Sequence, residues 1–139
     1  MKKTYATAVL LASLCCSAAH AEHPKYKCSA VKNTVSHSLD VSVDGAKLSE
    51  WSYLAATPAG DSSNTCSITS ADGTETDSLG VQSYATPAGT VMVTKKGASF
   101  VFDFSKLRIT DVCGQSSAMA KHITITPGSK RCTNVANAT

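Results

Sequence analysis

The stretch LDVSVDGAKLSEWSYLA, residues 39–55, alternates apolar and polar side chains on both sides of a turn. Before the turn the apolar positions are Leu39, Val41 and Val43. This period of two is typical of a strand with one buried face and one solvated face. Asp44-Gly45 is a favoured pair in tight hairpin turns, and Trp51 and Tyr53 mark the return strand. The stretch therefore predicts an antiparallel hairpin with one apolar face.

Short strands separated by turns continue through the rest of the chain. A second alternating segment should supply core side chains, namely Phe100, Phe102, Phe104, Leu107 and Ile109. Stretches with proline and glycine at residues 57–61, 86–89 and 127–128 interrupt the strands. About eight short strands with intervening turns predict an all-β fold, which we expect to be a small antiparallel β-barrel or sandwich.

The first part of the chain has the features of an export signal. Lys2 and Lys3 precede an apolar run over residues 6–16, and Ala19-His20-Ala21 supplies the small residues of a cleavage site. The apolar run is too short to cross a bilayer as a helix. We therefore expect a signal peptide at residues 1–21. The mature chain, residues 22–139, should form a single β-barrel domain in the periplasm or outside the cell.

The mature chain carries almost no net charge. Without Lys2 and Lys3, eleven Lys and Arg residues face ten Asp and Glu residues, which leaves a balance of +1. Broad nucleic-acid binding needs concentrated positive charge, so we expect no nucleic-acid partner. After the signal, no apolar stretch approaches the length of a membrane helix, so we also expect no membrane span.

Four cysteines remain in the mature chain: Cys28, Cys66, Cys113 and Cys132. An even number in a small exported protein predicts two disulfides. Zinc is the alternative, but the chain has no C-x-x-C pair and its histidines are scattered. Three pairings are possible. The lower entropy of closing short loops favours Cys28–Cys66 with Cys113–Cys132, and the residues alone do not decide among the three.

The sequence contains no recognisable catalytic constellation. It lacks a G-x-S-x-G elbow, an H-E-x-x-H pair and an EF-hand loop. His37 and His122 fall in strands among polar neighbours, while Asp103 and Asp111 fall at outward strand positions or turns. We therefore expect no enzyme, no cofactor and no metal site. A stiff disulfide-bonded β-domain is suited to presenting loops, which predicts a module that binds a protein partner.

Two segments resemble the periplasmic and membrane-bound inhibitors of c-type lysozyme. They are GVQSY at residues 80–84 and VMVTKKGASF at residues 91–100. The resemblance extends to Tyr26-Lys27-Cys28, which matches a Y-x-C start, and to Cys113 after a late apolar strand. Those inhibitors are exported by Gram-negative bacteria and fold as small antiparallel β-barrels. Their S-G-x-x-Y loop precedes a strand that ends in a lysine-glycine turn; here Ser78-Leu79-Gly80 stands where serine-glycine is expected.

The resemblance implies an inhibitor that inserts a loop into the active-site cleft of c-type lysozyme, where two catalytic carboxylates lie. The matching partner-binding positions are Ser78 or Ser83 for the serine, Tyr84 for a supporting tyrosine, and Lys95 or Lys96 for a cation. The resemblance also implies a Cys28–Cys113 disulfide, which would leave Cys66 to pair with Cys132, and this is the pairing that we favour.

Other interpretations of the same residues are open. Tyr84 can be an ordinary strand residue, and Lys95-Lys96-Gly97 a solvated hairpin turn. The alternative function is a secreted structural or adhesive module, such as a fimbrial-type subunit, or a periplasmic interaction domain. The last residues, 133–139, lack the aromatic strand that chaperone-assembled pilins use, and they look like a frayed tail. The oligomeric state is left open.

Overall fold

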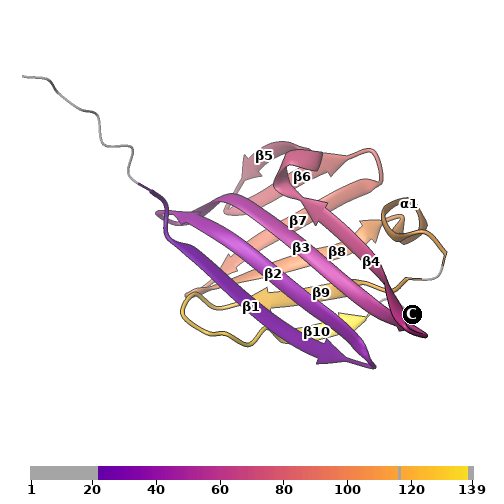
Figure 1. Cartoon of the computed structure of the whole chain (residues 1–139). Helices are drawn as coiled ribbons and strands as arrows, with labels where there is room; N and C mark the ends of the chain where they lie inside the picture. The colour runs from indigo at the N-terminus through magenta and orange to yellow at the C-terminus, as the bar shows by residue number, and fades with distance from the viewer. Residues whose placement is uncertain (1–21, 116, 138–139) are drawn as a thin grey trace, which may run out of the picture.

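A computed structural model of the chain describes residues 22–115 and 117–137, and nearly all of them belong to two antiparallel β-sheets (Figure 1). The predicted signal peptide, residues 1–21, lies outside the described residues. The all-β prediction is confirmed. The two sheets pack face to face as a sandwich and do not close into a barrel, so the sandwich is the correct one of the two architectures we expected.

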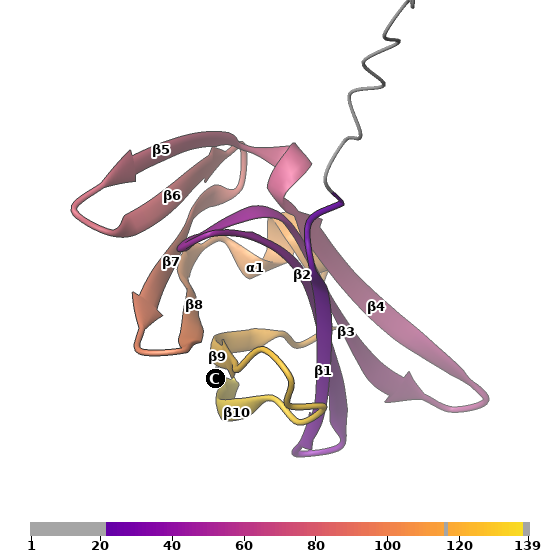
Figure 2. The ribbon, with the colours of Figure 1, turned by 90° about the vertical axis from the view of Figure 1, so that its left-hand side faces the viewer.

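The first sheet contains the predicted hairpin. Its strands pair in the order β1-β2-β3-β4, with β1 at Lys25–Lys32, β2 at Val35–Asp44, β3 at Lys47–Ala59 and β4 at Ser62–Thr69. Within the hairpin, Val41 pairs with Trp51, and a register shift follows between Ser42 and Val43. This bulge bends the tip of the β2–β3 hairpin toward the second sheet, as the side view in Figure 2 shows.

The second sheet has six strands in the order β10-β9-β8-β7-β6-β5. They are β5 (Thr74–Ser78), β6 (Val81–Thr86), β7 (Gly89–Lys96), β8 (Ser99–Leu107), β9 (Ala120–Ile125) and β10 (Thr133–Asn137). The structure thus has ten strands among its described residues, against about eight predicted. Both edge strands of this sheet lack an alternating apolar pattern. All five residues of β5 are exposed, and β10 occupies part of the expected frayed tail.

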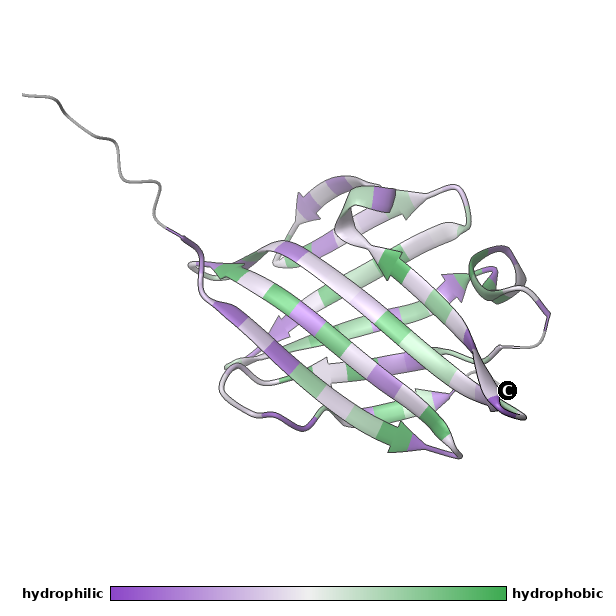
Figure 3. Ribbon diagram, in the orientation of Figure 1, coloured by the Kyte–Doolittle hydropathy of each residue, from purple (hydrophilic) through white to green (hydrophobic). Residues whose placement is uncertain are grey.

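The core lies between the inner faces of the two sheets. Hydropathy alternates along the strands, as the banding in Figure 3 shows. Trp51 packs edge-on against Tyr84 and Phe102, with ring centroids 5.2 and 5.4 Å away. Phe102 is fully buried, and Phe100 and Phe104 are nearly so, which confirms that the alternating segment of the second half faces the core. Such aromatic contacts add to the stabilisation that burial itself supplies.

The helices are short. A 3₁₀ turn, η1, covers Ser70–Asp72, and one α-helix, α1, covers Ile109–Cys113. We expected Ile109 to continue the alternation of β8, but the strand ends at Leu107 because Arg108 turns away and its backbone N–H donates to the carbonyl of Ala88 at 2.8 Å. Neither helix of the described chain has the length and apolar character needed to cross a membrane.

Both predicted disulfide pairings are wrong. All four cysteines of the described residues are disulfide-bonded, as expected, but the bonds are Cys28–Cys132 and Cys66–Cys113. The first strand does meet a late segment, but that segment is the one entering β10. The backbone of Ser29 in β1 makes two hydrogen bonds with this segment. Its N–H donates to the carbonyl of Lys130 and its carbonyl accepts the N–H of Cys132, each at 3.0 Å. Each disulfide therefore ties one sheet to the segments that flank the other sheet.

Candidate partner-binding site

Three hairpin turns gather at one end of the sandwich, the end that faces the viewer in Figure 2. They join β2 to β3, β5 to β6 and β7 to β8, and we call them together the hairpin end. A groove of about 440 Å³ runs between them. Its lining comes from all three turns, with Lys47 from the first, Leu79 and Gly80 from the second, and Lys95 and Gly97 from the third.

Three of the five predicted site residues lie at the hairpin end. Ser78 is exposed at the end of β5, and Lys95 and Lys96 are exposed at the end of β7. Lys95 continues the inward face of Val91 and Val93 beyond the core, which is why it borders the groove. No ion pair holds Lys95 or Lys96 within the part of the chain that the structure describes. The predicted hairpin turn is present, but it consists of Gly97 and Ala98, and the two lysines end the strand before it.

The other two predicted residues lie away from the groove. The loop of the β5–β6 hairpin contains just Leu79 and Gly80, so the segment from Val81 onward is strand and not loop. On this strand Ser83 and Tyr84 point to opposite faces. Tyr84 is 1% exposed and belongs to the core, where burial raises its pKa to about 12. Tyr84 can hold the strand beneath a site in place, but its ring is too buried to contact a partner directly.

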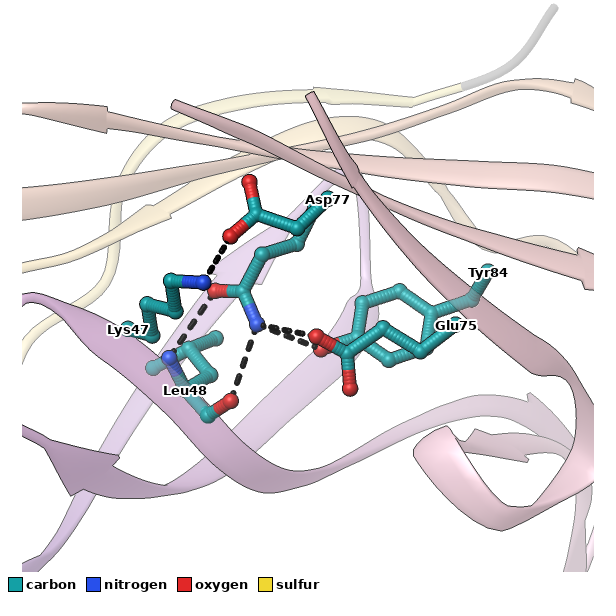
Figure 4. A network of polar contacts seen from close by, with 6 residues as sticks. Lys47, Leu48, Glu75, Asp77 and Tyr84 are labelled. Atoms are coloured by element: carbon teal, nitrogen blue, oxygen red, sulfur yellow. Dashed lines mark hydrogen bonds and ion pairs between the residues drawn. The ribbon is translucent and has the colours of Figure 1, made fainter. Parts of the chain in front are cut away.

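The β5–β6 hairpin is fastened to β3 by polar contacts that the sequence analysis missed (Figure 4). The buried side chain of Gln82 accepts a hydrogen bond from the backbone N–H of Leu48 and donates one to its carbonyl, both at 2.9 Å. The same amide nitrogen donates to the Glu75 carboxylate at 2.9 Å. Lys47 and Asp77 form an ion pair beside it, and this hydrogen-bonded contact raises the pKa of Lys47. These contacts fasten the β2–β3 and β5–β6 hairpins of the hairpin end to each other.

One feature of the hairpin end stands out chemically. Leu79 is completely exposed, and its backbone has a φ of +52°. The signal in the sequence was an apolar residue directly before Gly80 in a turn, where asparagine or aspartate is usual. The hairpin end thus offers a partner an apolar side chain, two cations without an ion pair, and a groove between them.

A larger groove of about 720 Å³ lies over the outer face of the first sheet. Its walls carry both signs of charge, with Lys25 and Lys27 opposite Glu50 and Glu75. Lys27 already pairs with Asp40 at 3.4 Å, so part of this charge is matched internally. The hairpin end is therefore the better candidate for recognition of a charged partner.

Within residues 22–115 and 117–137, no three His, Cys, Asp or Glu side chains come close enough to hold a metal ion. Comparisons with family models, with curated proteins and with solved structures found no match for the chain.

Proposed function

We propose that this chain is an exported binding protein, not itself an enzyme, that inhibits c-type lysozyme by placing its hairpin end in the active-site cleft. One observation carries the proposal. Ser78 and the Lys95-Lys96 pair are far apart in sequence, yet both stand at one end of the fold, where Lys95 and the turn residues next to Ser78, Leu79 and Gly80, line one groove. These are the positions that the resemblance to lysozyme inhibitors assigns to the contact with the enzyme.

Electrostatics supports this target. The cleft of lysozyme carries two catalytic carboxylates. Lys95 and Lys96 offer the opposite charge, and no carboxylate of the described chain pairs with them. A cation that enters a carboxylate-lined cleft makes charge-assisted hydrogen bonds, which are roughly twice as strong as neutral ones. The groove that Lys95 borders is a concave surface, and a wall of the lysozyme cleft could pack into it.

The proposed setting is the periplasm of a Gram-negative bacterium or its surroundings. Two disulfides are typical of proteins that work in an oxidising compartment. The features of residues 1–21 agree with passage through an export pathway.

The test is a turbidity assay of cell-wall lysis by hen lysozyme with the mature protein added. We expect lysis to slow in proportion to the added protein. Replacing both cations, Lys95→Ala with Lys96→Ala, should weaken inhibition about ten- to a hundredfold, because a lost charge-assisted contact costs about 1.5 to 3 kcal/mol.

The matched control removes the same charge at the opposite end of the second sheet. Lys106 lies near the end of β8 and Lys121 near the start of β9, and both are exposed. The Lys106→Ala, Lys121→Ala variant should inhibit like the wild type. Undiminished lysis at a large molar excess of wild-type protein would refute the proposed function.

A further inference from the structure

Leu79 differs from the residues that four other two-residue turns of the described chain carry at the same position. In five two-residue hairpin turns, the first loop residue has a left-handed backbone, with φ between +50° and +61°. The residues at this position are Asn33, Gly45, Gly60, Leu79 and Gly97. Glycine and asparagine adopt this conformation readily, whereas a leucine there strains the backbone.

Nothing within the described chain offsets this cost. The Leu79 side chain is completely exposed, while the next most exposed large apolar residues, Val31 and Leu54, are 74% and 45% exposed. An asparagine at position 79 would relieve the backbone and remove an apolar side chain from water. Strain without an internal benefit is typical of residues that act on a partner.

The turn that carries Leu79 is held firmly. Gln82 ties the hairpin to Leu48, and the Lys47–Asp77 ion pair fastens it again close to the tip. Leu79 and Lys95 border the same groove, so an apolar group and a cation are presented side by side. A partner that accepts both needs an apolar recess with a carboxylate next to it.

We propose that Leu79 is the apolar anchor of the hairpin end and enters a recess beside a carboxylate that Lys95 contacts. This inference rests on the proposed function. In lysozyme the catalytic acid lies in an apolar pocket with the second catalytic carboxylate nearby. That pocket has the required chemistry, and an occupied pocket would keep substrate away from the catalytic acid.

The test compares Leu79→Asn with the wild type in two measurements, the melting temperature and the inhibition of hen lysozyme. Leu79→Asn should melt a few degrees higher, because the left-handed turn now carries a favoured residue. The same variant should inhibit at least tenfold more weakly. Leu79→Met is the matched control, since it keeps an apolar side chain of similar size, and it should inhibit within about threefold of the wild type.

The outcomes separate this inference from the proposed function. A wild type that does not inhibit lysozyme overturns the proposed function and this assignment with it. Equal inhibition by Leu79→Asn and the wild type overturns the anchor alone, and the proposed function stands. A lower melting temperature for Leu79→Asn also overturns the anchor, because Leu79 would then stabilise the fold itself. A more stable variant with weakened inhibition supports it, since no merely structural role gains stability on losing the side chain.

Discussion

The side-chain amide of Gln82 in β6 pairs with the backbone of Leu48 in β3 as a neighbouring strand would, accepting its N–H and donating to its carbonyl at 2.9 Å each. The pairing of β3 with β4 extends only to Ser52, so the edge of β3 at Leu48 has no strand beside it there. One side chain from the second sheet therefore completes the hydrogen bonding of the first.

Replacing Gln82 by glutamate should destabilise the protein strongly. Gln82→Glu removes the N–H donors and places a carboxylate against the carbonyl of Leu48 and the carboxylate of Glu75. We expect the free energy of unfolding to fall by about 2 to 4 kcal/mol at pH 7, measured by urea denaturation. Acidification protonates the new carboxyl group, so the difference in the free energy of unfolding between this variant and the wild type should become smaller at low pH.

The control is the neighbouring Ser83→Ala, on the outer face, which should change the free energy of unfolding by less than about 0.5 kcal/mol. Equal stability of the two variants would contradict the role of Gln82.

Gly89 should tolerate no side chain. Its φ is +133°, and a Cβ atom there would lie 2.2 Å from the carbonyl oxygen of Lys106 in the paired strand. We expect Gly89→Ala to lose about 3 kcal/mol or more of stability, because backbone has to move. Gly60→Ala is the control. Its φ of +61° carries only the left-handed cost of about 1 kcal/mol, since no atom lies within 4 Å of the added Cβ. Similar melting temperatures for the two variants would contradict the steric argument.

The buried His37 should make stability fall under mild acid. The Tyr53 hydroxyl accepts the N–H of Ala120 and lies 2.7 Å from Nδ1 of His37, where it can donate its own proton to a neutral imidazole. Burial lowers the pKa of His37 below its ordinary 6.5, an effect that the nearby Asn137 side chain partly opposes. The unfolded chain therefore binds a proton that the folded chain resists. His37 therefore does not lower the free energy of unfolding above pH 6.5, and the free energy of unfolding declines as the pH falls below that value.

Urea denaturation at a series of pH values checks this prediction. His37→Phe should flatten the decline between pH 7 and pH 5, whereas His122→Gln, at the more exposed histidine, should keep it. An unchanged pH profile in His37→Phe would show that other groups cause the decline.

The disulfide connectivity can be read directly. Peptide mapping without reduction should find Cys28 linked to Cys132 and Cys66 linked to Cys113, and no free thiol. The bonds close spans of 104 and 47 residues, and loop closure predicts that removing either one costs about 4 to 5 kcal/mol. Detection of Cys28–Cys66 or Cys28–Cys113 peptides would contradict the strand arrangement itself.

Local patterns were enough to predict the fold class. The alternation through Val41 and through Phe102 depends on a period of two along a single strand, and both segments lie in the core. Turn chemistry also identified the Lys95-Lys96-Gly97 hairpin. The two disulfides were predicted but their pairing could not be, because it depends on β10, whose residues TNVAN carry no strong strand pattern.

The candidate site was predictable only in part. Ser78 and Lys95 could be found because they stand next to glycine-containing turns. The resemblance implied a loop at Tyr84 and the other interpretation implied a strand; the strand is correct, because the two-residue turn at Leu79-Gly80 returns the chain to strand before Tyr84. The role of Gln82 depends on Leu48, which lies 34 residues earlier in the chain, and no spacing along the sequence indicates such a contact.

The Cys28–Cys132 bond also decides how the domain carries mechanical load. It joins the first strand to the segment that enters the last one, so tension applied at Glu22 and Asn137 runs through this covalent link. The 104-residue span between the cysteines, about 350 Å of extended chain, remains slack while the sulfurs are joined. The chain between Cys28 and Cys132 cannot extend under tension while this bond is oxidised, whatever happens to the strands between them.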